Sequence, residues 1–158
     1  MNYLKMVPII LAALLISAAP NNVFSAEKIQ IVCVGSGKAH IPVLNYSKST
    51  GQETNSFSIT ETAIESAKCE IATERVLLCK TGKIATQGIG PEGTVAISFD
   101  YLLDRISGVI NTTTTSYYDR NYFANTFPRS RSQIMGYAGE VYKQWTFEGN
   151  CTKAKRKF

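Results

Sequence analysis

The chain has 158 residues, of which 44% are hydrophobic and 18% are charged, with 17 lysines and arginines against 12 aspartates and glutamates. A chain of this length forms at most one ordinary domain, and its composition excludes intrinsic disorder, a collagen-like repeat and a coiled coil. A folded core is therefore expected, but these numbers point to no particular activity.

Residues 1–26 have the pattern of a cleaved secretory signal peptide. A cation at Lys5 precedes an apolar run over residues 6–16, and small residues lead to the cut site. This order suits a leader because the apolar middle inserts as a helix and the small residues enter the peptidase. The apolar run is shorter than the roughly 20 residues that span a bilayer. We therefore expect a periplasmic or secreted protein with a domain over 27–152 and a basic tail over 153–158.

The first part of the mature chain predicts a β-hairpin. Residues 29–34 alternate and are rich in β-branched side chains, residues 35–37 supply a glycine-containing turn, and residues 40–46 form the second strand. Residues 47–56 are polar, so we expect a loop there. A short strand is predicted at 57–59.

The following segment allows two interpretations. Thr62 and Glu65 form a capping-box pattern, and nearby apolar residues fall close to helical spacing, which favours a short helix over 62–72. Residues 75–79 and 84–86, in contrast, predict two strands around a turn. We predict strands for this second half and leave 62–72 open between helix and strand.

The C-terminal half contains the clearest strand, over residues 94–101, where larger and smaller side chains alternate. Its larger side chains on one face are those of Val95, Ile97, Phe99 and Tyr101. The threonine-rich segment 109–118 predicts another strand, residues 119–132 are expected to be irregular, and 135–147 ends the fold. Strands at such short intervals predict a small all-β single domain, an antiparallel barrel or sandwich of lipocalin-like size.

The four cysteines all follow the predicted leader, and an oxidising compartment preserves disulfides. Three pairings exist. We favour Cys33 with Cys151 and Cys69 with Cys79, because the first bridge would tie the opening strand to the closing strand. Metal ligands are usually closely spaced and include histidines, and the single histidine, His40, has no such neighbour. We therefore expect neither a metal nor a cofactor.

A D-R-x-S-G turn after the alternating strand consists of Asp104, Arg105, Ser107 and Gly108. Together with the terminal Gly149-x-Cys151, it resembles small exported bacterial proteins that have a signal peptide, a compact β fold and no assigned activity. In those proteins an early cysteine and a final G-x-C recur, which agrees with a bridge from Cys33 to Cys151. The pair Cys69 and Cys79 departs from that pattern. The resemblance implies no function.

Aromatic and guanidinium groups crowd into one segment that is the candidate binding surface. Such side chains are enriched where proteins hold partners, because each buries a large area at small entropic cost. The candidate residues are Tyr117, Tyr118, Arg120, Tyr122, Phe123, Arg129 and Arg131. In an alternative interpretation, the aromatic side chains pack inward from a strand while the arginines face solvent. Both interpretations stay open at this point.

Residues 109–158 hold the positive excess of the mature chain, whereas residues 27–108 are close to neutral. Cations attract polyanions through long-range forces, so we expect an anionic envelope polymer or another protein as partner, and no nucleic acid for an exported protein. Our first hypothesis is a non-catalytic binding or inhibitor module of the cell envelope. The alternative is a small envelope hydrolase that uses carboxylates such as Asp100 and Asp104.

Overall fold

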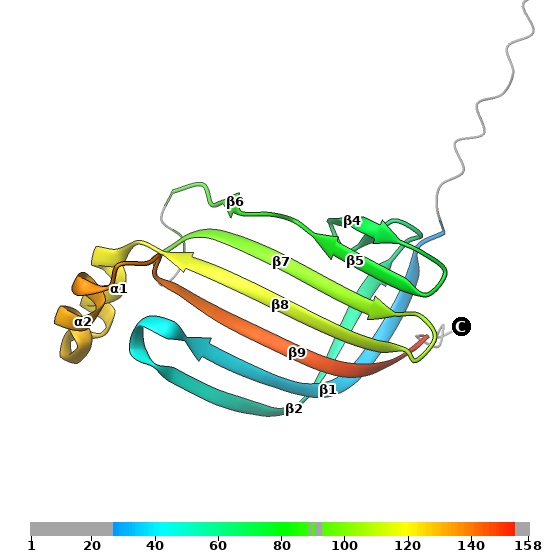
Figure 1. Cartoon of the computed structure of the whole chain (residues 1–158), viewed down its shortest axis with the longest axis horizontal. Coiled ribbons are helices and arrows are strands. Elements are labelled where there is room, and N and C mark those ends of the chain that lie inside the picture. Colours follow the sequence, from blue (N-terminus) through cyan, green and yellow to red (C-terminus); the bar gives the residue numbers. More distant parts are fainter. Residues whose placement is uncertain (1–26, 89, 91–92, 154–158) are drawn as a thin grey trace, which may run out of the picture.

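The structure is a computed structural model that describes residues 27–88, 90 and 93–153 (Figure 1). The predicted signal peptide at 1–26 and the predicted tail beyond Lys153 lie outside these residues. Within the described ranges, no helix combines the length and the apolar character needed to cross a membrane.

The described residues form nine strands, and every pairing between them is antiparallel. The strands are β1 (Ile29–Ile41), β2 (Tyr46–Ile59), β3 (Ala63–Ile64), β4 (Ala67–Ala72), β5 (Val76–Lys80), β6 (Ile84–Ala85), β7 (Thr94–Asp104), β8 (Val109–Tyr118) and β9 (Tyr142–Lys153). Short helical elements are η1 (Pro42–Leu44), α1 (Arg120–Thr126), η3 (Pro128–Ser130) and α2 (Arg131–Gly136). The predicted antiparallel all-β fold is confirmed.

The strand order is β5-β4-β3-β2-β1-β9-β8-β7-β6, and an additional pairing of β5 with β7 closes the sheet into a ring. This closure is confined to one end, because β3 pairs with β2 only at Ile59 and Ile64. Figure 1 shows β4 and β5 at that end and α1 and α2 at the other. Towards the helices, β2 pairs with β1 alone, and β6 covers only two residues of β7. The interior face of the sheet is therefore enclosed at the β5 end and open near the helices.

Two apolar clusters hold the fold together. The larger cluster fills the closed end and comprises Ile31, Cys33, Phe57, Ile64, Ala67, Leu77, Cys79, Tyr101, Leu103, Ile110 and Phe147. The smaller cluster lies beneath the helices and comprises Ile41, Val43, Phe123, Ala124, Ile134 and Val141. Full burial of one such large side chain contributes roughly 1.5 to 3 kcal/mol, so these clusters supply the main stabilising term.

Both predicted disulfides are present, Cys33 with Cys151 and Cys69 with Cys79. In each bridge the two cysteines are direct partners across neighbouring antiparallel strands. The first bridge ties β1 to β9, the opening strand to the closing strand, as expected. Because the two strands already pair side by side, this bridge reinforces a contact that the sheet itself makes.

The predicted turn at 35–37, second strand at 40–46 and loop at 47–56 are all wrong. β1 continues through the glycines to Ile41, η1 follows, and β2 pairs along its whole length. The glycines serve close approach here. A Cβ at Gly35 would lie 1.9 Å from the carbonyl oxygen of Glu148 on β9, so only glycine lets β1 and β9 come together. The chain reverses instead at η1, where Asn45 adopts a left-handed conformation with φ 50°.

The segment 62–72, which the pattern left open, forms the strands β3 and β4 rather than a helix. Between them Glu65 has φ 52°, and its carboxylate accepts a hydrogen bond from the Ser58 backbone N–H at 2.6 Å. Glu65 thus lies in the turn between β3 and β4, and its carboxylate binds the backbone of β2. The helical spacing of the apolar residues is overridden by strand pairing.

The predicted irregular segment 119–132 is wrong, because it contains α1, η3 and the start of α2. Asp119 caps α1 by accepting a hydrogen bond from the Tyr122 backbone N–H at 2.8 Å. The helices form because their apolar side chains complete the smaller cluster against β1 and η1. The last strand, β9, begins at Tyr142 and continues through Cys151. The segment 135–147, predicted as the last element of the fold, therefore covers the end of α2, the connection that follows it and the first half of β9.

Candidate functional site

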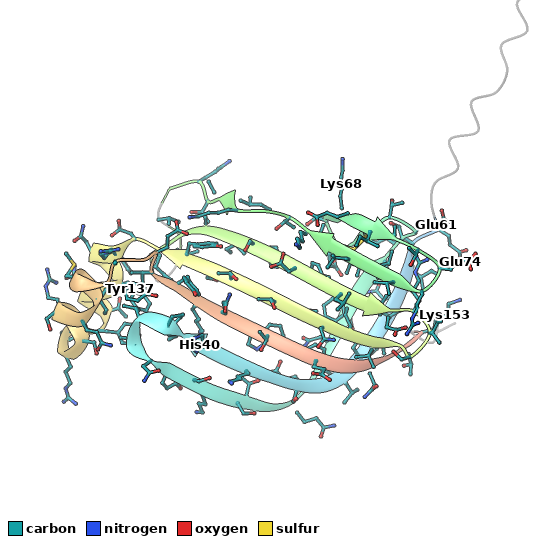
Figure 2. All side chains as sticks on the ribbon, viewed as in Figure 1. His40, Glu61, Lys68, Glu74, Tyr137 and Lys153 are labelled. Atoms are coloured by element: carbon teal, nitrogen blue, oxygen red, sulfur yellow. A yellow bond between two sulfur atoms is a disulfide. The ribbon has the colours of Figure 1, made fainter. Side chains whose placement is uncertain are left out.

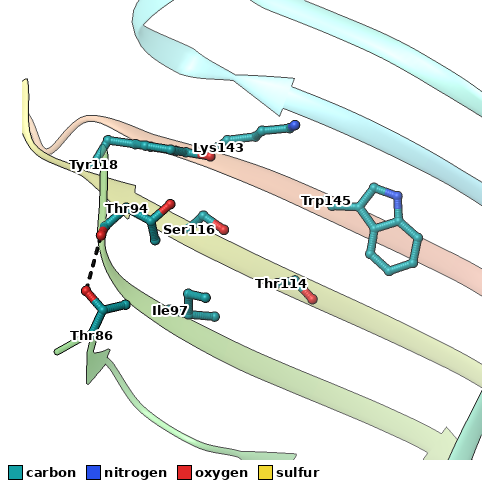
Figure 3. A pocket seen from close by; sticks show the side chains of 8 residues that line it. All are labelled: Thr86, Thr94, Ile97, Thr114, Ser116, Tyr118, Lys143 and Trp145. Atoms are coloured by element: carbon teal, nitrogen blue, oxygen red, sulfur yellow. Dashed lines mark hydrogen bonds between the residues drawn. The ribbon is translucent and has the colours of Figure 1, made fainter. Parts of the chain in front are cut away.

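A groove of about 440 Å³ lies on the interior face, at the open end of the sheet (Figure 3). Its walls come from β7, β8 and β9 and from the segment just after β6. The lining residues are Thr86, Thr94, Ile97, Thr114, Ser116, Tyr118, Lys143 and Trp145. Volumes of this size are typical of sites for small ligands. We call these eight residues the groove.

One end of the groove is aromatic (Figure 3). Trp145 stacks on Phe147, with ring centroids 5.8 Å apart and an interplanar angle of 13°. Phe147 is fully buried in the larger cluster, whereas Trp145 is only half-buried. The larger apolar cluster therefore extends as far as Trp145, and the indole of Trp145 separates the packed interior from the groove.

A second set of polar groups meets the indole above Gly37 of β1. A Cβ at Gly37 would lie 2.4 Å from Thr50 Oγ1, 2.9 Å from Glu53 Oε1 and 3.0 Å from Trp145 Nε1. Three side chains from β2 and β9 thus converge in the space that the glycine leaves free. A one-residue irregularity between β1 and β2 at Gly37 places Thr50 in this position.

The interior face of β8 carries a row of hydroxyl groups at alternate positions, Thr112, Thr114 and Ser116. Neighbours in the row are about 6.8 Å apart, as the repeat of an extended strand requires. Thr112 is 4% exposed, and its Oγ1 has no hydrogen-bond partner. Within the described part of the chain, the side chains of Thr114 and Ser116 make no hydrogen bond either. The row extends from the core into the groove.

Lys143 supplies the one cationic side chain of the groove. It pairs with Ser116 across β8 and β9. The same lysine and Tyr118 also line an adjoining cavity of about 260 Å³ beneath α1. No carboxylate of the described residues forms an ion pair with Lys143. A half-buried ammonium group without an anionic partner attracts a ligand anion, because partial burial weakens the screening by water.

The predicted binding surface is divided by the fold. Tyr118 lines the groove and contacts the ring of the buried Phe123, with centroids 5.0 Å apart. Tyr117 faces the other side of the sheet, where its ring meets that of Tyr142 and the ammonium group of Lys83 lies 4.1 Å from its centroid. The sequence segment therefore contributes to both faces of β8, and only one of its aromatic side chains reaches the groove.

The arginines of that segment have different surroundings. Arg120 donates hydrogen bonds to the carbonyl oxygens of Met135 and Gly139, at 3.4 and 2.7 Å, and so ties α1 to the end of α2. Arg131 donates to the side chain of Asn125. Arg129 is exposed in η3, and Tyr122 is exposed on α1, where its ring covers Gly93. Arg120 and Arg131 thus make contacts that support the helices.

Asp104 and the rest of the D-R-x-S-G motif build the turn between β7 and β8. The carboxylate of Asp104 accepts hydrogen bonds from the backbone N–H groups of Ile106 and Ser107, at 2.9 and 3.2 Å. The backbone N–H groups of Ser107 and Ile106 lower the pKa of Asp104 below its ordinary value. Arg105 donates to the carbonyl oxygens of Thr73 and Glu61, which joins this turn to the neighbouring hairpins. The motif is structural.

The second carboxylate of the hydrolase alternative lies apart from any described cavity. Asp100 pairs with Thr113 on β8 and with Lys80 on β5. Neither Asp100 nor Asp104 lines the groove or any of three further cavities formed by the described residues. The two aspartates therefore lend no support to carboxylate catalysis.

His40 lies on β1 near the helical end, far from Glu61 and Glu74 at the opposite end of the molecule (Figure 2). Across the described ranges, no three side chains of histidine, cysteine, aspartate or glutamate come together in a way that could hold a metal ion.

No family model, curated protein or solved structure matches this chain.

Sequence reasoning missed the groove residues Lys143 and Trp145 and the neighbouring Glu53. One signal was present, because the only tryptophan stands two positions before Phe147 and alternates with it in a segment predicted to end the fold. Glu53 carried no comparable signal, since it lies in a polar stretch that was expected to be a loop. Its position depends on the pairing of β2 with β1.

Proposed function

We propose that this chain is an extracytoplasmic, non-catalytic binding protein of the cell envelope that holds a small ligand in the groove. The observation that carries the proposal is the combination of the Trp145 indole with the side chains of Thr114, Ser116 and Lys143, which have no hydrogen-bond or ion-pair partner within the described protein. Core positions of a β fold are normally filled by apolar side chains and their polar groups are hydrogen-bonded. Here hydroxyl groups and an ammonium group line a cavity instead.

The placement outside the cytoplasm rests on the cysteines and on the predicted leader. All four cysteines are paired, and disulfides persist in oxidising compartments. The pattern of residues 1–26 predicts export to such a compartment. These two features support a periplasmic or secreted location.

The interior also argues for a small ligand rather than a long lipid tail. Phe57, Tyr101 and Phe147 fill the closed end, with Phe57 meeting the rings of Tyr101 and Phe147 at 6.1 and 6.4 Å. An acyl chain would need an apolar tunnel into this region, where the side chains are already close-packed. A ligand that enters the groove therefore stops at Trp145.

The test is equilibrium dialysis of the mature protein against a mixed library of small metabolites, with bound compounds identified by mass spectrometry. A Ser116→Phe variant fills the groove and should lose the retained compounds. Thr113→Phe is the matched control, because it adds the same ring to the other face of the same strand. Thermal unfolding of both variants checks that the fold is intact.

The proposal is supported when the wild type and Thr113→Phe retain the same compounds and Ser116→Phe does not. Retention that is equal in all three proteins would place binding elsewhere on the surface. Retention of nothing by the wild type would remove the proposed function altogether.

A further inference from the structure

We infer that the ligand of the groove is an acidic sugar, a pyranose ring that carries one carboxylate. This inference rests on the proposed function and deepens it by naming the ligand class. It follows from three properties of the site: the Trp145 platform, the unpartnered hydroxyl and carboxylate groups beside it, and the single lysine.

The platform selects a ring. The Trp145 indole is stacked with the ring of Phe147, and the half-buried indole lines the groove. A flat aromatic surface of this kind buries a large area without loss of conformational freedom, and it suits the apolar face of a cyclic ligand. Ile97 adds a second apolar contact on β7. A flexible linear ligand would gain less from such a rigid platform, because it would lose more conformational entropy on binding.

The polar groups require hydroxyl groups on that ring. Glu53 Oε1 and Trp145 Nε1 converge above Gly37, and a carboxylate accepts hydrogen bonds whereas an indole N–H donates them. Thr114 and Ser116 add hydroxyl groups that can do both. A ligand hydroxyl satisfies either role, so a polyhydroxylated ring matches this mixture. A purely apolar ring would leave these groups desolvated and unpaired, which is costly.

The charge of the groove sets the charge of the ligand. Lys143 is the only cation among the lining residues, and no carboxylate of the described chain forms an ion pair with it. One ammonium group matches one carboxylate, whereas a polyphosphate would need several cations. Lys143 lies two positions from Trp145 on β9, and their side chains line the same groove. In Figure 3 the side chains of Lys143 and Trp145 extend from β9, and those of Ser116 and Thr114 lie on the neighbouring strand β8.

The first experiment titrates the fluorescence of Trp145, the only tryptophan in the chain, with three probes. D-glucuronate has the ring, the hydroxyl groups and the carboxylate. D-glucose lacks the carboxylate, and cyclohexanecarboxylate lacks the hydroxyl groups. We expect D-glucuronate to bind about tenfold more tightly than either of the others, the effect of one charge-assisted hydrogen bond or a set of neutral ones.

The second experiment measures D-glucuronate binding by calorimetry for Lys143→Met, which keeps the aliphatic stem and removes the charge. The expected result is a loss of about tenfold in affinity, to the level of D-glucose. Lys38→Met is the control, because Lys38 is an exposed cation on the opposite face of β1. Glu53→Gln provides an independent variant. It should weaken D-glucose, and it should weaken D-glucuronate less, because the substitution also removes a negative charge that repels the carboxylate of that ligand.

Equal affinity for D-glucuronate and cyclohexanecarboxylate would overturn the assignment to a sugar. Equal loss in Lys143→Met and Lys38→Met would overturn the role of Lys143. If no probe binds while the dialysis experiment still retains compounds in a groove-dependent way, the ligand class is wrong and the proposed function stands. If neither experiment detects binding, both fail.

Discussion

Two glycines two positions apart on β1 make a sharp test of how the interior face is built. At Gly35 an added Cβ would meet backbone, at 1.9 Å from the carbonyl oxygen of Glu148 and 2.4 Å from the Cα of Gly149. At Gly37 the added Cβ would meet only the ends of side chains, those of Thr50, Glu53 and Trp145. The same substitution to alanine therefore probes a strand contact in one case and the groove in the other.

The expected magnitudes differ accordingly. In Gly35→Ala, β1 and β9 must separate, which adds lost ladder hydrogen bonds to an overpacking cost of about 1 to 3 kcal/mol. We expect a destabilisation of about 3 kcal/mol or more. In Gly37→Ala, the displaced side chains can rotate away, and alanine is favoured over glycine in a strand by about 0.5 to 1 kcal/mol. The net change in the free energy of unfolding should stay within about 1 kcal/mol of zero.

The assay is urea unfolding followed by far-ultraviolet circular dichroism, with the emission of Trp145 recorded in the native state. Gly37→Ala should change the native emission, because the new methyl group lies against the indole, while Gly35→Ala should mainly lower the urea midpoint. Wild type and Gly136→Ala serve as controls for handling and for glycine replacement outside the interior contacts, because a Cβ at Gly136 meets no atom within 4 Å and its φ is not positive. Similar destabilisation of Gly35→Ala and Gly37→Ala would refute the placement of Gly37 under movable side chains.

Three further outcomes are expected. Replacing Cys33 and Cys151 by alanine should lower the free energy of unfolding by about 5 kcal/mol, whereas replacing Cys69 and Cys79 should lower it by about 3 kcal/mol. These values follow from the chain-entropy model, because the bridges span 118 and 10 residues. Equal urea midpoints for the two double variants would contradict this expectation. Carboxyl NMR should find the pKa of Asp104 below its ordinary value, because two backbone N–H groups stabilise its charged form. The stability that Asp104 contributes should be present above its pKa in the unfolded chain and should be lost as the pH falls through its pKa in the folded chain. If the stability difference between the wild type and Asp104→Ala did not change with pH, this role of Asp104 in the turn would be wrong. Burial, and secondarily the charge of Glu65, raise the pKa of Tyr101 above 10.0. The stability that Tyr101 contributes should therefore be complete below its pKa in the unfolded chain and be lost as the pH rises through its pKa in the folded chain, and Tyr101→Phe should remove this loss. Ultraviolet absorbance in which every tyrosine titrates at the ordinary pKa would contradict the expected shift.

Local alternation determined much of the sheet. The strict alternation around Phe99 and Tyr101 predicted β7, and the threonine run predicted β8, because β-branched and aromatic side chains suit a pleated surface. The stacking of Phe99 on Tyr101 at 6.4 Å and the place of Ile97 in the groove confirm that these side chains share one face. Val95 falls at an irregularity between β7 and β8, so it does not continue the series.

The glycine-rich and polar segments misled the same reasoning for a physical reason. Gly35 and Gly37 were expected to turn the chain, but each allows another part of the molecule to approach, which no local pattern encodes. The stretch 47–56 contains no apolar residue, yet it forms most of β2 because β1 provides a partner along its whole length. The helices around 119–136 form because their apolar side chains complete the smaller cluster.

The sequence by itself determined an all-β fold, because alternation is local. It favoured one of three cysteine pairings, and the strand register in the structure, which places Cys33 opposite Cys151 and Cys69 opposite Cys79, decided it. The groove depended on tertiary structure. Glu53 comes from β2, whereas Lys143 and Trp145 come from β9, and only the pairing of β2 with β1 and of β1 with β9 brings them to one face. Strand register is a long-range property, so the positions of these side chains could not be deduced from the residues beside them.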